Sequence, residues 1–278
     1  MSLTIITNKA AMSSLQQLNA TTDNLEQVQS RLGTGLRIAT SKDNSAIWAI
    51  AQTQRADMGG LAAVRMGLDR AMSIGDTALT AGQSVAELLV KMKERVVAAQ
   101  DVSINGVSRQ ALQEDFSALL RQVAQVVRDA AFDDVRLLDN SLPGGVRFLA
   151  DAEGAAFITL ANQDLRLGQA VITLSVTASV LTLSTASASL ALLNASIDNV
   201  SLALSEMGAQ LKQLEQHNTF VGKLSDSVEG GVGNLVDADL AKESARLQSL
   251  SVHQQLGAQA LAIANQAPQI ILSLFRSG

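Results

Sequence analysis

Apolar residues recur every three or four positions along most of the chain, which is the spacing of helices that bury one face. The longest run spans 61–99, a second spans 112–130 after a turn at 105–106, and the clearest spans 190–228. All three fit a heptad repeat. They predict a mainly α protein built as an elongated antiparallel coiled coil or helical bundle.

The pattern changes between the second and third runs. From about 132 to 175, Pro143 and several glycines separate short apolar runs such as 146–149 and 156–160. Runs of this length between turn residues predict a small β-hairpin region. The Ser, Thr and Ala-rich stretch from 175 to 189 is expected to be surface at its start and helical toward its end.

The two ends of the chain are almost uncharged. No Asp, Glu, Lys or Arg occurs from Leu247 to Phe275, and Lys9 is the only charged residue from Met1 to Thr22. A membrane span is the first alternative, but the C-terminal stretch carries many Gln and Asn amides, which are costly in hydrocarbon. We therefore expect both terminal helices to pair and to be buried against protein, which makes the subunit depend on its neighbours.

The apolar residues of these two ends form the predicted assembly interface. They are Met12, Leu15, Leu18, Leu25, Val28, Leu32, Leu247, Leu250, Leu261, Ala264, Ile271, Leu274 and Phe275.

Composition narrows the function classes. Apolar residues make up 47% of the chain and aromatic residues only 3%, which favours slim helix packing over a wide globular core. A net charge of -5, without a basic stripe, argues against binding to nucleic acid. Cysteine is absent, so neither disulfides nor thiolate metal ligands are available. The start lacks the pattern of a cleaved signal peptide, so export would need another route.

Two glycine clusters lie where the terminal helices should join the rest of the chain, at Gly33 and Gly35 and at Gly230, Gly231 and Gly233. Neither cluster has the strand, helix and Lys context of a phosphate-binding loop. We interpret both as hinges that use the backbone freedom of glycine.

Acidic residues near these glycines have a structural interpretation. Asp237 and Asp239 should cap a helix after a glycine turn, and Ser41 and Asp43 should do the same before the helix that contains Trp48. His217 and His253 are 36 residues apart in the sequence and show no metal-ligand spacing. The sequence predicts no metal site, no catalytic residues and no cofactor.

The end sequences resemble a known family. Residues 31–38 read RLGTGLRI and are followed by KDN at 42–44 and AIA at 49–51; residues 236–244 read VDADLAKES, 259–267 read QALAIANQA, and 271–276 read ILSLFR. These motifs, in this order at the two ends, closely resemble the signatures of bacterial flagellins, especially the short flagellins of alphaproteobacteria.

The resemblance implies a layout and a function. Residues 1–37 and 238–278 would form an inner domain of terminal helices, and 38–237 a rod-like outer domain with the hairpin region on its flank. The chain would be a secreted structural subunit, not an enzyme, that polymerises with itself or with paralogous flagellins into the extracellular filament of the bacterial flagellum. Its other partners would be the flagellar type III export apparatus, a chaperone, and the hook-associated and cap proteins, with neither nucleic acid nor membrane among them.

Two alternatives remain open at this point. A hook-filament junction protein would share related end helices and export, but would join the polymer without extending it. A soluble coiled-coil adaptor would bind one defined partner through its ends. Open-ended growth distinguishes the filament subunit from both, because contacts that fail to close give fibres.

Overall fold

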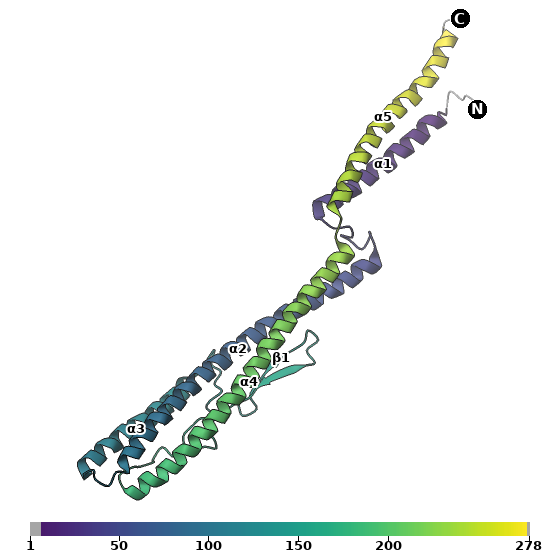
Figure 1. Cartoon of the computed structure of the whole chain (residues 1–278). Coiled ribbons are helices and arrows are strands. Elements are labelled where there is room, and N and C mark those ends of the chain that lie inside the picture. Colours follow the sequence, from purple (N-terminus) through teal and green to yellow (C-terminus); the bar gives the residue numbers. More distant parts are fainter. Residues whose placement is uncertain (1–6, 277–278) are drawn as a thin grey trace. The chain divides into compact units, whose positions relative to one another are not determined.

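The computed structural model describes the backbone of residues 7–276 and the side chains of residues 7–266. Within this part of the chain the structure has five helices and one two-stranded sheet (Figure 1). The elements, in chain order, are α1 (Lys9–Thr34), α2 (Ser45–Ala99), α3 (Gly106–Asp129), β1 (Val146–Leu149), β2 (Phe157–Leu160), α4 (Leu183–Val236) and α5 (Leu240–Arg276). The predicted mainly α fold with a small hairpin is confirmed.

The chain divides into two compact units. One comprises residues 1–56 and 228–278 and contains the paired helices α1 and α5. The other comprises residues 57–227 and contains α3, both strands and most of α2 and α4. The first unit also includes the beginning of α2 and the end of α4. The boundaries of the inner and outer domains stay a prediction.

The second unit is organised around the apolar stripe of α2. Every position of the predicted repeat from Leu61 to Ala99 is buried. Leu68, Leu89 and Met92 are fully enclosed, and α4 contributes Met207 and Leu214 to the same core. Burying a side chain of this size stabilises the fold by about 1.5–3 kcal/mol. The heptad pattern therefore predicted this core correctly.

Helix α3 folds back beside α2 after a short turn. The Asn105 side chain accepts a hydrogen bond from the Ser108 amide at 2.8 Å and so caps the start of α3. Arg109 donates to the carbonyl oxygens of Ala99 and Asp101 at the end of α2. A cation at a helix C-terminus is favourable, because the helix dipole is negative there.

The β-hairpin covers part of the groove between α2 and α4. β1 and β2 are antiparallel, with Val146 opposite Leu160 and Leu149 opposite Phe157. Leu160 is fully buried, whereas the Arg147 guanidinium lies 4.2 Å from the centre of the exposed Phe157 ring. One face of the hairpin therefore belongs to the core and the other is at the surface.

Two glycines on α2 let α4 approach closely. A Cβ atom on Gly75 would lie 2.3 Å from Cδ2 of Leu211, and a Cβ on Gly82 would lie 2.4 Å from Cδ2 of Leu204. Both the glycines and the leucines are seven residues apart, so each leucine enters a notch one heptad from the next. These contacts set the antiparallel register of α2 and α4.

We predict that Gly75→Ala destabilises the protein by about 1–2 kcal/mol, because the new methyl group overpacks Leu211 and the buried Leu160. The matched control is Gly67→Ala on the same helix, where a Cβ would have nothing within 4 Å. That change should stabilise α2 by up to about 1 kcal/mol through helix propensity. Urea unfolding of monomeric protein measures both. Equal stability of the two variants would show that Leu211 does not pack closely against Gly75.

Candidate assembly interface

Helices α1 and α5 form an antiparallel pair (Figure 1). Four cross-helix contacts establish its direction, since residue numbers fall on one helix as they rise on the other. These contacts are Arg31 to Glu243, Thr22 to Gln254, Leu18 to Gly257, and Asn8 to Ala264. The predicted pairing of the terminal helices is therefore confirmed.

The buried and half-buried residues that recur along the facing sides of α1 and α5 at heptad spacing are called the seam; Thr22 and Arg31 lie beside it. Seam positions alternate in steps of three and four on both helices, as in a coiled coil. The seam residues are Ala11, Ser14, Leu18, Thr21, Leu25, Val28, Leu32, Glu243, Leu247, Leu250, Gln254, Gly257, Leu261 and Ala264. Several of them are polar or small, so this pair buries less apolar surface than α2 and α4 do.

Most of the residues predicted for assembly belong to this seam within the single chain. Leu18, Leu25, Val28, Leu32, Leu247, Leu250, Leu261 and Ala264 are all buried or half-buried there. Met12 and Leu15 are exposed, Met12 by 58%. The side chains of Ile271, Leu274 and Phe275 lie outside the described part of the structure.

A second apolar stripe on α5 was missed by the sequence reasoning. Val252, Leu256 and Ile263 are all exposed, Ile263 by 68%. Their spacing of four and seven residues is itself helical, and this spacing was the available signal. We call these three residues the α5 stripe, and Met12 with Leu15 the α1 edge.

The α1 edge lies on one side of the pair, and Leu256 and Ile263 of the α5 stripe lie on the other, whereas Val252 faces away from the seam. Met12 and Leu15 each follow a seam residue, whereas Leu256 and Ile263 each precede one. In an antiparallel coiled coil, residues that follow seam positions on both helices share one side, and residues that precede them share the other. The α1–α5 pair therefore presents two separate apolar surfaces.

The corner between α1 and α2 depends on one glycine. Gly35 has φ 71° and its amide donates to the Arg31 carbonyl at 2.9 Å, which ends α1 in the left-handed conformation that glycine tolerates. The chain then pairs briefly with the segment before α5, through a bridge between Leu36 and Asp237.

The glycine turn predicted at Gly230, Gly231 and Gly233 is wrong, because α4 continues through these residues. Val232 and Val236 are buried, and this burial outweighs the low helix propensity of glycine. Gly33 likewise lies in the last turn of α1. A hinge function for the five glycines stays a prediction.

The N-terminal cap predicted for α5 is confirmed, whereas the cap predicted for α2 is formed by a different residue. Asp239 caps α5, since its Oδ1 accepts hydrogen bonds from the amides of Ala241 and Lys242 at 3.1 Å each. The expected cap of α2 by Ser41 or Asp43 is wrong, because Asn44 accepts from the Ile47 amide at 3.1 Å.

Asp43 instead organises the turn before α2. Its Oδ2 accepts hydrogen bonds from the amide of Thr40 at 2.9 Å and from that of Ala39 at 3.1 Å. The Thr40 backbone hydrogen bond is the main reason that the pKa of Asp43 is below its ordinary value. Asp237 contributes its backbone to the bridge with Leu36 and not a helix cap.

One ion pair joins α1 to α5 among the residues whose side chains are described. Arg31 Nη1 lies 3.5 Å from Glu243 Oε1, and Glu243 is only 8% exposed. Each charge suits its position, since Arg31 is in the last turn of α1 and Glu243 in the first turn of α5. Arg31 Nε and Glu243 Oε2 are buried without hydrogen-bond partners. The pair is thus incompletely satisfied within one chain.

Comparison with known proteins decides the family. Residues 5–142 match the model of the bacterial flagellin N-terminal helical region, and residues 190–275 match that of the C-terminal helical region. The chain belongs to the bacterial flagellin family. It is 48% identical to flagellin FljJ of Caulobacter vibrioides, over all of both chains. It is 32% identical to a flagellin of Brucella melitensis, over 98% of this chain and 99% of the relative.

A solved structure shares the fold at low identity. A protein described as a flagellar hook-associated protein from Vibrio parahaemolyticus aligns with TM-score 0.56 and 14% identity. The alignment covers 70% of this chain and all of the other. As a flagellin, the chain is a structural subunit of the extracellular flagellar filament.

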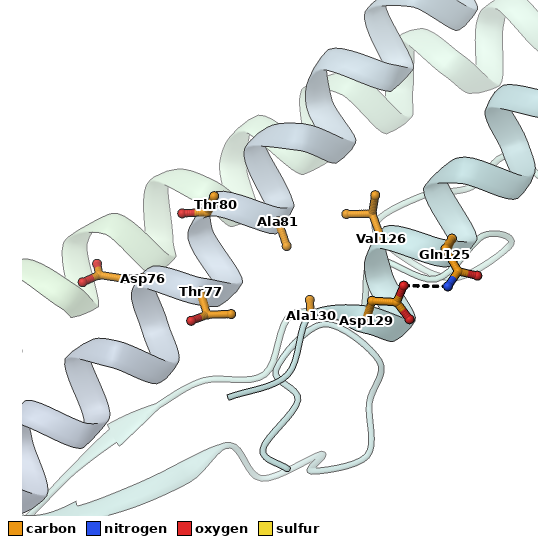
Figure 2. Close-up of a pocket in the computed structure, with 8 residues that line it drawn as sticks. All are labelled: Asp76, Thr77, Thr80, Ala81, Gln125, Val126, Asp129 and Ala130. Carbon is orange, nitrogen blue, oxygen red and sulfur yellow. Dashed lines mark hydrogen bonds between the residues drawn. The ribbon is translucent and has the colours of Figure 1, made fainter. Parts of the chain in front are cut away.

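One hollow on this flagellin lies between α2 and α3 and has a volume of about 550 Å³ (Figure 2). Figure 2 shows Asp76, Thr77 and Thr80 on one side and Gln125 and Asp129 on the other. Gln125 Nε2 donates to Asp129 Oδ2 at 2.6 Å. The lining brings together no nucleophile and base, so it gives no support for catalysis.

The remaining candidate ligands are dispersed. Within the described residues, no three His, Cys, Asp or Glu side chains are grouped so that they could hold a metal ion. His217 Nε2 lies 2.7 Å from the Ala150 carbonyl oxygen and ties α4 to the hairpin loop, while His253 is exposed on α5. No helix in residues 7–276 is both long and apolar enough to cross a membrane.

We predict that Arg31→Met weakens the α1–α5 pair of this flagellin by about 3 kcal/mol, because it leaves the Glu243 carboxylate buried without a partner. The double variant Arg31→Met with Glu243→Leu should regain most of the loss. Hydrogen exchange of α5 amides in the monomer measures this, with protection reduced roughly a hundredfold in the single variant. An unchanged single variant would mean that water already solvates Glu243.

Proposed function

We propose that this flagellin polymerises through its α1–α5 pair, with the α1 edge and the α5 stripe buried by neighbouring copies. Residues 1–37 and 238–278 would form the inner domain, and residues 38–237 the outer domain with its hairpin region at 132–175. The glycines at 33, 35, 230, 231 and 233 would absorb bending between the two domains.

The observation that carries the proposal is the placement of exposed apolar residues on the parts of α1 and α5 that lack charged side chains, residues 10–22 and 247–275. Ile263 and Met12 are exposed in stretches that contain almost no charged side chains. The hydrophobic effect favours the burial of such surfaces against a partner, and neither charge repulsion nor the loss of charge hydration opposes it.

The position of the two apolar surfaces further supports open-ended growth. A single self-complementary patch would favour a closed dimer with two-fold symmetry. Two different patches on opposite sides of the pair instead favour heterologous contacts, in which each copy offers a different surface to each neighbour. Such contacts give a helical polymer when the rotation does not close.

The polymer partners would be identical chains or paralogous flagellins. Five flagellins of one organism, Caulobacter vibrioides, are 44–48% identical to this chain over nearly its full length. The export apparatus, a chaperone, and the hook-associated and cap proteins would be transient or terminal partners. The chain would have no catalytic activity of its own and would need no cofactor.

We predict that Ile263→Asp raises the critical concentration for seeded polymerisation at least a hundredfold. The change removes about 1.5–3 kcal/mol of apolar burial and places an unpaired carboxylate in the contact. Because Ile263 lies outside the seam, the monomer should melt as the wild type does. Seeded sedimentation and calorimetry are the two measurements.

Two further variants sharpen this test. Leu261→Asp places the same charge in the seam and should weaken the α1–α5 pair already in the monomer. Ser244→Asp adds the charge at an exposed position directly after the first turn of α5, close to the positive end of the helix dipole, and should assemble normally. Normal polymerisation of Ile263→Asp would refute the α5 stripe as a contact. Wild-type protein that joins seeds without extending them would favour the junction-protein alternative.

A further inference from the structure

Thioether sulfur is the only sulfur in this chain, which has seven methionines and no cysteine. Their exposure differs sharply. Met92 and Met207 are fully enclosed in the core, whereas Met12 is 58% exposed and Met66 is 69% exposed. Oxidants that convert methionine to its sulfoxide act first on accessible thioethers. Met12 and Met66 are therefore the most accessible described targets in the folded subunit.

Only Met12 of these two lies on the α1 edge. It follows the seam residue Ala11 and shares its side of α1 with Leu15. Met66 lies on α2 in the other compact unit. The two methionines thus combine similar exposure with different locations, which makes Met66 a matched control for Met12.

We propose that Met12 is an oxidation-sensitive site that controls whether the subunit can assemble, an inference that rests on the proposed function of the α1 edge. The oxidant is of the peroxide class. The Met12 sulfur donates an electron pair to one peroxide oxygen, the O–O bond breaks, and the peroxide is reduced to water. The product is methionine sulfoxide, with a polar S–O group where the reduced side chain is apolar.

The fold and the assembly respond differently to this change. In the free subunit the sulfoxide oxygen is hydrated, because Met12 lies outside the seam, and the α1–α5 pair is retained. In the polymer the same oxygen loses its water against an uncharged surface, and burying it without a hydrogen bond is unfavourable. Once Met12 is covered by a neighbour, the oxidant no longer reaches it. Oxidation therefore prevents free subunits from joining the polymer, while Met12 in subunits that are already assembled stays reduced.

The experiment compares wild-type, Met12→Leu and Met66→Leu monomers before and after hydrogen peroxide, with peptide mass mapping to locate the sulfoxides. Oxidation should raise the critical concentration of wild type and of Met66→Leu about ten- to a hundredfold, the loss that one buried methionine side chain represents. Met12→Leu should assemble equally before and after oxidation, since leucine has a similar volume. Circular dichroism should stay unchanged in all three, and methionine sulfoxide reductase should restore the wild type.

Unoxidised Met12→Gln gives a second measurement, because a polar side chain of similar length should reproduce the defect without any oxidant. The inference is overturned if oxidised Met12→Leu loses assembly as the wild type does, which would implicate the half-buried Met58 or Met72. It is also overturned if Met66→Leu is the protected variant. Failure of Ile263→Asp to assemble, together with normal assembly of oxidised wild type, would retain the proposed function and reject only the role of Met12.

Discussion

Heptad packing between antiparallel helices is the interaction on which both units of this flagellin depend. In the second unit the packing is nearly all apolar, and glycine notches at Gly75 and Gly82 admit Leu211 and Leu204. In the first unit the same geometry uses Thr21 and Gln254 at seam positions. Both units also keep apolar side chains outside their packed stripes, such as Met66 and Leu202 in the second and Met12 and Ile263 in the first. The exposed apolar side chains of α1 and α5 differ in that most lie in stretches with almost no charged residues.

Electrostatics reinforces this division. Charged side chains cover the exposed faces of α2 and α3, where Arg95 and Asp115 form an exposed pair of small energetic value. Among the described side chains, one ion pair crosses from α1 to the seam, Arg31 with the seam residue Glu243, at the end where the helix dipoles favour both charges. Toward the other end of the pair, cross-helix contacts come from amides and hydroxyls such as Asn8 and Thr22. The outer surfaces there can be buried without desolvating charge.

The sequence predicted the packed core well, because periodicity reports which face of a helix is buried. The repeat from Leu61 to Ala99 and the strand from Val146 to Leu149 both appear where the pattern placed them. Periodicity does not report which partner covers a face. Leu261 and Ile263 are both apolar residues of α5, yet one lies in the seam and the other points away from it. The sequence reasoning therefore named Leu261 and did not name Ile263, and the assembly role of both stays a prediction.

Predictions from single residues, such as a glycine turn or an aspartate cap, failed where side-chain packing or a neighbouring residue determined the local structure. Glycine normally disfavours a helix, but Val232 and Val236 bury their side chains and carry α4 past Gly230 and Gly231. Asp43 has cap chemistry, but it binds the amide of Thr40 and leaves the cap to its neighbour. Propensity is worth at most about 1 kcal/mol at such positions, which is less than one buried aliphatic side chain contributes.

The small size of the exposed apolar surfaces has a consequence for growth. Each side of the α1–α5 pair offers two or three apolar side chains, and each contributes about 1.5–3 kcal/mol on burial. Bringing two subunits together costs on the order of 4–15 kcal/mol in lost translational and rotational freedom. One such contact would therefore contribute about 3–9 kcal/mol, which is of the same order as the cost of association and leaves little surplus to hold two subunits. In the proposed assembly, a subunit at the end of an existing polymer would bury both surfaces at once against several neighbours, so that the sum of contacts would exceed the cost of association there.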